Sequence, residues 1–484
     1  MAKKLVHFET LGCKLNQVES EGAAKCFADS GFVVSAEPFT AGTPENVDVS
    51  VCVVNTCTVT AKAEQKARRV IRLLLSKCPC AVIIITGCYA QLNKEELLSI
   101  DERVCVLGGQ RKGFLSQVPP LIAENLEKSA VEIKSRLQLF FDEKTAAAKP
   151  NEISEPFNLS TLSFFNHSRA SLKIQDGCNC VCTYCRIRLA RGTSVSLDAA
   201  QVVSRVRQLE ESGHSEVVIT TVNIAQYRSK IVGSDGKESV INFSGLLKLI
   251  LESTSSIGIR ISSLYPEIVD EAFGKIVSNP RVRPHFHISV QSGSDEILRK
   301  MKRPYKIEAV FRACDILRKA KKNPFLACDI IAGFPGETDE DFEATMKMLD
   351  ECGFTFVHAF PFSPRPGTEA FSMRPMVANY VTDERIRRLE EFNARHKGSY
   401  IASFVGKELP AVTETVHRAA SKIVMREKII VHAVTENFLH CQIVFAEGSD
   451  IPKPGSLVTV KIIRALEKNE RTGESEVLAE LCAS

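Results

Sequence analysis

The sequence predicts an α/β protein in three parts: an N-terminal parallel α/β domain, a central partial (β/α)6 barrel and a small C-terminal all-β barrel. Strand-like and helix-like runs alternate over residues 4–108, and the alternation resumes from about residue 171. From about residue 400, short β-prone runs are instead separated by turn residues. We place the three domains at residues 1–140, 165–375 and 400–470.

Short apolar runs predict four buried strands in the N-terminal part. Helices are expected between them at residues 18–30 and 60–77, and Gly31 is suitably placed to end the first helix. Strands that alternate with helices form a parallel sheet with crossover helices. The four strands are predicted at residues 4–11, 47–55, 81–86 and 104–107.

The central part is predicted to follow residues 128–168, whose mixed composition indicates a linker or an irregular crossing segment. Six strands in a row, with helical stretches such as 196–212 and 338–351 between them, predict a partial, TIM-like barrel, because a full barrel would need two more units. Residues 376–399 are predicted to be helical. The six strands are predicted at residues 172–175, 217–222, 257–263, 286–290, 326–332 and 354–360.

The C-terminal part carries the runs "KIIVHAV", "FLHCQIVF" and "SLVTVKIIRAL" between turn residues, which predict a small antiparallel barrel. The composition is that of an ordinary globular protein, and the net charge of +4 indicates nothing about nucleic acid. No apolar run approaches the roughly 18 residues of a membrane span, and no signal peptide is evident. We therefore expect a cytoplasmic protein.

Cysteine is the unusual residue, with 17 copies in the chain. An odd number in a long chain argues against a disulfide framework, and clustered cysteines in a reducing compartment more often bind metal. Four of them lie in the stretch "DGCNCVCTYCRIRLARG", which starts at Asp176. They are Cys178, Cys180, Cys182 and Cys185.

Several interpretations of these four cysteines are open. Structural zinc sites usually have two short cysteine pairs separated by a longer loop, and a redox pair of Cys182 and Cys185 would need a thioredoxin-like context. Unliganded thiols this dense would be prone to oxidation. An iron–sulfur cluster fits the pattern C-x₃-C-x₂-C of Cys178, Cys182 and Cys185. Three protein ligands would leave one iron open, and Cys180 would be a spectator.

Three further cysteines each follow a predicted N-terminal strand. Cys13, Cys57 and Cys88 lie just past the first, second and third strands, where ligand sites of open α/β sheets form. Gly12 and Gly87 beside two of them would allow close approach of the backbone. Three converging thiolates could hold a second cluster. The alternative is that all three are ordinary loop cysteines, as we expect for Cys78 and Cys80 of "KCPC".

Polar residues on the central strands are further candidates. Asp329 lies within its strand, and a buried acid needs a partner, so it is a structural group of the barrel interior or a cofactor contact. Ser289 and Gln291 lie two residues apart, share a face and could line the barrel mouth. His285 and His287 also share a face, and we interpret them as packing residues.

The C-x₃-C-x₂-C pattern after the first strand of a partial barrel resembles the radical S-adenosylmethionine enzymes, and the aromatic Tyr184 before the last cysteine fits too. The resemblance implies that the open iron of a cluster on Cys178, Cys182 and Cys185 binds the amino and carboxylate groups of S-adenosylmethionine. Electron transfer then cleaves the sulfonium and produces a 5′-deoxyadenosyl radical. The spacing by itself indicates only three local thiolates.

The segments "LGCKLNQ", "NTCTVT" and "GCYAQ" resemble three signatures of the methylthiotransferase family, as do "ISVQSGSDEILRKMKRPY", "DIIAGFPGET" and "FPFSPRPGT". The family plan of a cluster domain, a radical domain and a TRAM domain covers nearly the whole chain. The resemblance implies two 4Fe-4S clusters, with the second on Cys13, Cys57 and Cys88, and S-adenosylmethionine as cofactor. It implies tRNA, an unidentified electron donor and an unidentified sulfur source as partners, and neither a membrane nor DNA.

Within the family, "LGCKLNQ" most resembles the MtaB-type enzymes, which act on threonylcarbamoyladenosine in tRNA. This implies addition of a methylthio group to carbon 2 of N6-threonylcarbamoyladenosine next to the anticodon. The alternatives are isopentenyladenosine in tRNA, a ribosomal protein as substrate, or, in another class, a non-catalytic zinc-dependent RNA-binding protein. Four residues depart from the family pattern and bear on substrate specificity: Val18, Arg186, Arg188 and Thr221.

Basic residues also gather on the second predicted helix. A solvated helix face is the usual reason for such a cluster, but an RNA contact is the alternative, because phosphate contacts dominate RNA affinity. The cluster comprises Lys62, Lys66, Arg68, Arg69 and Arg72.

Overall fold

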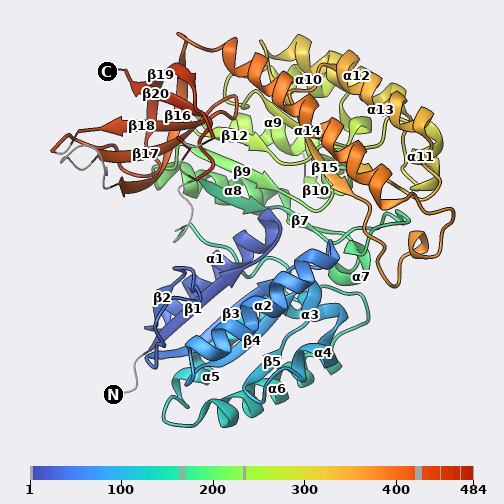
Figure 1. The fold of residues 1–484 in the computed structure, drawn as a ribbon. Helices are drawn as coiled ribbons and strands as arrows, with labels where there is room; N and C mark the ends of the chain where they lie inside the picture. The colour runs from blue at the N-terminus through green and yellow to red at the C-terminus, as the bar shows by residue number, and fades with distance from the viewer. Residues whose placement is uncertain are drawn as a thin grey trace.

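The computed structural model describes residues 4–162, 164, 169–232, 236–419, 428–446, 448–468, 470–471 and 473–482. Figure 1 shows three bodies along the chain: an α/β domain at the N-terminus, a larger α/β body in the middle and a β-barrel at the C-terminus. This is the predicted fold class. In the described part of the chain, no helix is long and apolar enough to cross a membrane.

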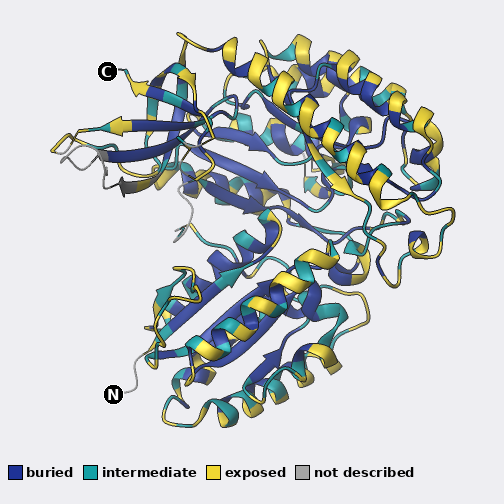
Figure 2. Cartoon of the chain, in the orientation of Figure 1, coloured by how far each residue is buried: buried dark blue, intermediate teal, exposed yellow. Residues whose placement is uncertain are grey.

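The N-terminal domain is a five-stranded sheet in the order β2-β1-β3-β4-β5, and every neighbouring pair is parallel. The sequence missed only β2, because a three-residue edge strand is too short to show a pattern. Figure 2 shows the central strands buried, as expected for a parallel sheet covered on both faces. The strands are β1 (Leu5–Thr10), β2 (Val33–Ser35), β3 (Val49–Thr56), β4 (Val82–Gly87) and β5 (Val104–Val106).

Helices cover both faces of this sheet. One face carries α1, α5 and α6, and the other carries α2 and α4, each through its apolar residues. Gly31 follows α1 with φ +80°, a conformation that suits glycine at a helix end, as predicted. The helical elements are α1 (Lys14–Asp29), α2 (Ala61–Lys77), α3 (Cys88–Leu92), α4 (Lys94–Leu98), η1 (Gly109–Gln117), α5 (Val118–Ala123) and α6 (Ala130–Ala146).

The predicted linker at residues 128–168 was wrong for its first half, because residues 130–146 form α6. Ser129 and Glu132 make a reciprocal capping box at the start of this helix. Ile133, Leu137 and Phe141 recur every four residues and pack against the sheet. Both signals are visible in the sequence. Residues 163 and 165–168 of the same segment lie outside the described residues.

The central body has six parallel strands side by side in chain order. Two three-stranded sheets, β12-β9-β6 and β13-β14-β15, meet through bridges from Ile259 to Val282 and from Leu264 to Ile288. The predicted partial barrel is therefore confirmed. Its strands are β6 (Ala170–Lys173), β9 (Glu216–Thr220), β12 (Gly258–Ile261), β13 (His285–Gln291), β14 (Phe325–Ala332) and β15 (Phe356–Pro361).

Helices form the outer layer of this barrel, with their exposed faces outward (Figure 2). They are α8 (Ala199–Glu211), α9 (Phe243–Ser253), α10 (Glu271–Val277), α11 (Asp295–Lys300), α12 (Ile307–Ala320), α13 (Asp339–Cys352) and α14 (Asn379–Ala402). Short elements fill the connections: β7 (Gln175–Asp176), α7 (Ile187–Arg191), β8 (Val195–Ser196), η2 (Ile224–Gln226), β10 (Ser229–Val232), β11 (Glu238–Ile241), η3 (Pro266–Ile268) and η4 (Glu369–Phe371).

The C-terminal part is a closed five-stranded barrel in the order β16-β17-β18-β20-β19, which confirms the predicted small β-barrel. The predicted antiparallel pairing was wrong for one pair, because β18 and β20 run parallel. Closure leaves no free strand edge, which is how small β-domains avoid edge-to-edge association. The strands are β16 (Glu408–Ala419), β17 (Lys428–Thr435), β18 (His440–Phe445), β19 (Leu457–Ala465) and β20 (Val477–Leu481).

A buried ion cluster fastens the C-terminal barrel to the central body. The Glu216 carboxylate accepts hydrogen bonds from Arg260 at 2.7 Å and Arg283 at 2.9 Å. Arg260 also donates to the Thr435 carbonyl at 3.1 Å. Arg169, 3.6 Å from Glu216, pairs with a carboxylate of β16. Burial opposes ionisation of Glu216, but the surrounding arginines outweigh it and lower its pKa to about 2.

Replacing Glu216 by glutamine should therefore lower the free energy of unfolding by about 3–5 kcal/mol at neutral pH, because buried arginines lose their counter-charge. Urea unfolding measures this change. A depressed carboxylate pKa contributes stability above the unfolded pKa, so the difference from the native chain should shrink as pH falls from about 4.3 toward the folded value of about 2. Glu252→Gln, on an exposed pair with Lys248, is the matched control. Equal effects of the two changes would contradict this account.

Candidate active site

The four clustered cysteines lie in the loop after β7 and line one cavity between the N-terminal domain and the central barrel. The cavity has a volume of about 350 Å³ and is open to solvent on one side. Gly177 begins this loop with φ +67°, and a Cβ there would lie 2.0 Å from the Thr193 carbonyl oxygen. Only glycine therefore fits where the chain turns from the strand into the cysteine loop.

The thiols of this loop receive hydrogen bonds that favour thiolates. Cys180 lies between Cys178 and Cys182, and its thiol hydrogen bond is the main cause that lowers the pKa of each neighbour to about 6. The same contacts raise the pKa of Cys180. Arg303 donates to the Cys182 sulfur at 3.4 Å. Burial raises the pKa of Cys185 to about 12. Cys178 and Cys182 are therefore the most readily ionised thiols of the run.

The four candidate residues outside the cysteines, Tyr184, Ser289, Gln291 and Asp329, line the same cavity as these thiols. Gln291 has φ +75° at an irregularity in the pairing of β13 with β14. Non-glycine residues rarely adopt such a φ, and where they do the backbone strain is commonly part of a functional site.

Asp329 is 24% exposed rather than fully buried, and its carboxylate has a partner. His287 Nε2 lies 3.2 Å from its carboxylate, and His287 Nδ1 lies 2.9 Å from the Ser263 hydroxyl. The three side chains form a polar chain at the cavity wall, so His287 does more than pack. His285 is the packing residue that we predicted, since it is buried and stacks on Phe438 at 3.9 Å.

The structure brings the second set of cysteines together. Cys13 begins α1, Cys57 follows β3 and Cys88 begins α3. Burial and then the nearby Cys88 and Cys13 thiols raise the pKa of Cys57 to about 11. A Cβ on Gly12 would lie 2.5 Å from the Cys57 Cβ, and one on Gly87 would lie 2.3 Å from the carbonyl oxygen beside Cys57. Both glycines therefore permit the close approach that the sequence predicted.

The cysteines expected to be unrelated to a site lie elsewhere. Cys78 is buried beneath α2, where its thiol hydrogen-bonds that of Cys52. Cys80 is exposed. In the described part of the chain, no three histidine, cysteine or acidic side chains are arranged to hold a single metal ion. Two thiol trios with no carboxylate or imidazole among them fit iron–sulfur clusters, which are held by cysteine thiolates.

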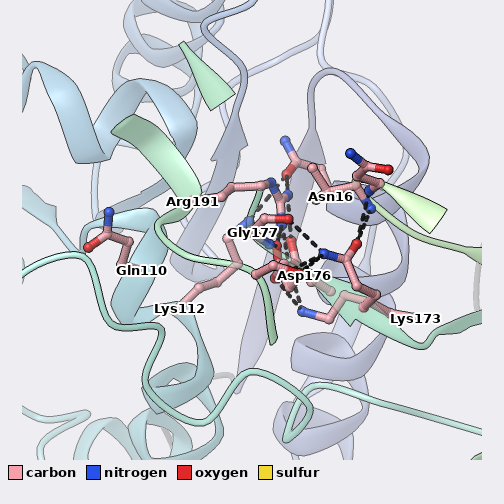
Figure 3. A network of polar contacts seen from close by, with 12 residues as sticks. Asn16, Gln110, Lys112, Lys173, Asp176, Gly177 and Arg191 are labelled. Carbon is pink, nitrogen blue, oxygen red and sulfur yellow. Dashed lines mark hydrogen bonds and ion pairs between the residues drawn. The ribbon is translucent and has the colours of Figure 1, made fainter. Parts of the chain in front are cut away.

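A buried network of charges joins the N-terminal domain to the central barrel (Figure 3). Glu19 of α1 pairs with Lys112 of η1 at 2.5 Å and with Lys173 of β6 at 2.8 Å. Asp176 pairs with Lys173 and with Arg191 of α7, both at 2.9 Å. Arg191 also lies 3.1 Å from Glu19. Each side chain is at most 5% exposed. Three cations and two anions leave one positive charge in excess.

This network reaches the main chain beside both cysteine sets. Asn16 accepts from Arg191 at 2.8 Å and donates to the carbonyls of Leu11 at 2.8 Å and Thr56 at 3.1 Å, next to the Cys13 and Cys57 segments. Asp176 accepts from the Gly177 amide at 2.7 Å, directly before the cysteine loop. The network therefore sets the position of one cysteine set relative to the other.

Sequence reasoning missed several of these residues. Arg303 lies within the signature "ISVQSGSDEILRKMKRPY", and Arg191 lies within the cysteine-rich stretch that starts at Asp176. Their segments were identified from the sequence, but their contacts were not. Asn223, which donates to Cys180 at 3.4 Å and to Cys178 at 3.7 Å, lies in a loop after β9. Lys112 has no local signal, because its partner Glu19 is 93 residues away.

Replacing Glu19 by glutamine should leave three buried cations with one anion. This change should lower the free energy of unfolding, measured by urea denaturation, by about 3–5 kcal/mol. Adding Lys112→Met should recover part of this loss, because it removes a cation that has lost its partner. Glu95→Gln, at an exposed position of α4, should change stability by less than about 0.5 kcal/mol. Additive effects of the Glu19 and Lys112 changes would contradict the shared network.

Comparisons with known proteins show the family of this chain. Residues 172–349 match the Radical SAM superfamily, and residues 5–109 match Uncharacterized protein family UPF0004. The chain is 41% identical to threonylcarbamoyladenosine tRNA methylthiotransferase MtaB of Treponema pallidum, over 94% of this chain and 98% of that protein. MtaB of Bacillus subtilis is 33% identical over 95% of this chain and 94% of its own length.

MtaB of Aquifex aeolicus is 32% identical over 95% of this chain and 99% of its own length. Among solved structures, the radical S-adenosylmethionine methyltransferase TsrM of Kitasatospora setae aligns with a TM-score of 0.47 and 15% identity, over 76% of this chain and 77% of that one. The identities to three MtaB proteins over nearly their full lengths decide the family. The chain belongs to the MtaB family of radical S-adenosylmethionine methylthiotransferases.

Proposed function

We propose that this enzyme adds a methylthio group to carbon 2 of N6-threonylcarbamoyladenosine next to the anticodon of tRNA. The observation that carries the proposal is the meeting of two thiol trios, one from each domain, across one buried network. Thr58, which directly follows Cys57, lines the cavity that holds the other trio. The names of the MtaB relatives supply the substrate class.

Each trio would hold one 4Fe-4S cluster, on Cys178, Cys182 and Cys185 in the barrel and on the three N-terminal cysteines in the other domain. When bound, the first cluster would supply an electron to S-adenosylmethionine, which produces a radical able to remove a hydrogen that no protein base can take from an adenine ring. Tyr184, Ser289, Gln291 and Asp329 would line the S-adenosylmethionine site, because they share the cavity with the barrel thiols.

The chain's own residues would orient and shield these groups. Arg303 is held by ring contacts, 4.6 Å from the Tyr265 centroid and 5.0 Å from that of Tyr305. It therefore presents a fixed positive charge to Cys182. Asn223 and the Cys180 amide, 3.4 Å from the Cys178 sulfur, place further donors at the sulfur atoms. Hydrogen bonds to thiolate sulfur stabilise its negative charge without supplying a fourth ligand.

The outer face of α2 supports tRNA as the partner. Lys62, Lys66, Arg69 and Arg72 are exposed there and have no ionic partner in the described structure. The helix begins directly after Thr60 at the cavity wall, and Figure 1 shows one of its ends beside α7. A stripe of unpaired cations that leads to a substrate cavity suits the phosphate backbone of RNA. The C-terminal barrel at residues 400–470 would add the RNA contacts of a TRAM domain.

Anaerobic iron and sulfide analysis tests the two cluster sites. The native chain should hold about eight irons, as two four-iron clusters require. Cys182→Ala and Cys57→Ala should each lose about half of this iron, because each removes one of three ligands. Cys180→Ala and Cys78→Ala, the matched cysteine controls, should lose none. Iron loss in Cys180→Ala would indicate a fourth ligand and no open iron, and bound zinc would overturn the radical mechanism.

Nucleoside analysis by mass spectrometry tests the substrate. The reconstituted enzyme, with S-adenosylmethionine and a reductant, should add the mass of one methylthio group to threonylcarbamoyladenosine in tRNA. A gain on isopentenyladenosine or on a ribosomal protein instead would favour the alternatives within the family.

A further inference from the structure

The cavity wall next to the cysteine loop carries an arginine pair. Arg186 directly follows Cys185, Arg188 lies in the first turn of α7, and both line the cavity. Both residues depart from the family pattern that the sequence resembles. Neither residue has a role in the cluster sites described above.

Arg186 is held in an ion cluster that crosses between the domains. It donates to the Glu64 carboxylate and to the Thr58 hydroxyl of the N-terminal domain, each at 3.1 Å. Arg365, from the loop after β15, pairs with the same carboxylate and is 5% exposed. Two buried arginines therefore share one acid, and the Nε atoms of both lack a hydrogen-bond partner. The cluster carries one positive charge in excess.

Arg188 is free. Its side chain is exposed and has no hydrogen-bond or ionic partner in the part of the chain that the structure describes. The other charged residues that line the cavity are engaged: Arg303 by Tyr265, Tyr305 and the Cys182 sulfur, and Asp329 by His287. This wall therefore offers an unpaired guanidinium, beside a cluster of the same sign, to whatever enters the cavity.

We propose that Arg188 binds the carboxylate of the threonylcarbamoyl side chain and so distinguishes this base from uncharged adenosines. The inference rests on the proposed function. The threonyl part of this base carries a carboxylate, whereas adenosine and isopentenyladenosine carry no charge on the base. A guanidinium binds a carboxylate through two parallel N–H···O bonds, which supply both affinity and orientation. The positive Arg186–Glu64–Arg365 cluster attracts the same anion and keeps the wall in place.

A carboxylate is not the only anion that an exposed arginine can bind. A phosphate of the tRNA backbone and the carboxylate of S-adenosylmethionine offer related chemistry. Binding measurements distinguish these three anions. Only the threonylcarbamoyl carboxylate is absent when the tRNA carries unmodified adenosine at the target position. Only an Arg188 contact with the carboxylate of S-adenosylmethionine would make the affinity for S-adenosylmethionine, measured without RNA, depend on Arg188.

The test compares the native enzyme, with both clusters loaded, with Arg188→Gln and Arg188→Lys. Equilibrium binding is measured for tRNA with threonylcarbamoyladenosine, for the same tRNA with unmodified adenosine, and for S-adenosylmethionine alone. Arg188→Gln should weaken binding of the modified tRNA by about 10- to 100-fold, as expected for loss of a charge-assisted hydrogen bond. Binding of the unmodified tRNA and of S-adenosylmethionine should not change. Arg188→Lys should be intermediate, because an ammonium lacks the two-pronged geometry.

Arg312→Gln is the matched control, because Arg312 is an exposed arginine of α12 on the outer layer of the barrel. An equal loss for both tRNAs would assign Arg188 to a phosphate and overturn the proposal. A loss of S-adenosylmethionine binding, or no change at all, would overturn it too. If the native enzyme itself fails to methylthiolate the modified tRNA, the proposed function fails. If the native enzyme methylthiolates the modified tRNA, and Arg188→Gln still binds the modified tRNA more tightly than the unmodified tRNA to the native extent, only this inference fails.

Discussion

The arrangement of the two cysteine sets depends on one buried network of charges between the domains. Glu19 and Asp176 are the only acids in a group with three cations, and every member is almost fully buried. Charges in such a place are tolerated only when they pair closely, since their desolvation is expensive. The pairing therefore has one geometry, in which α1 of the first domain faces α7 and β6 of the second (Figure 3).

The second constraint is the direction of the strands. In a parallel sheet all carboxyl ends meet at one edge, so Cys13, Cys57 and Cys88 converge although they are far apart in the sequence. The cysteine loop of the barrel likewise lies beyond the carboxyl end of β6, which runs parallel to β9. The network joins these two edges, and a single cavity results that contains side chains of both domains.

The cavity separates several kinds of chemistry by position. Sulfur atoms and their hydrogen-bond donors lie on the cysteine loop, where Arg303 and Asn223 favour negative charge on sulfur. The polar chain of Asp329 lies on the strands, and unpaired positive charge lies at the start of α7. A ligand that spans these regions would meet an orienting group at each end.

The sequence alone determined the fold class and the candidate cysteines. Alternating apolar runs are local patterns, and so are the cysteine spacing and the place of each cysteine relative to its strand. It missed β2, which is too short for periodicity, and α6, whose capping box and four-residue apolar spacing were present but were outweighed by mixed composition.

Only the tertiary structure decided how the site is joined. Lys112, Lys173 and Arg191 meet Glu19 across 93, 154 and 172 residues, and Arg303 meets Cys182 across 121. Side-chain pairs at such separations leave no periodic trace in the chain, because each residue's own neighbours indicate only an ordinary basic or acidic position. The sequence could name the sulfur atoms, but the charges that hold the two sets in place are defined by the packing of the two domains.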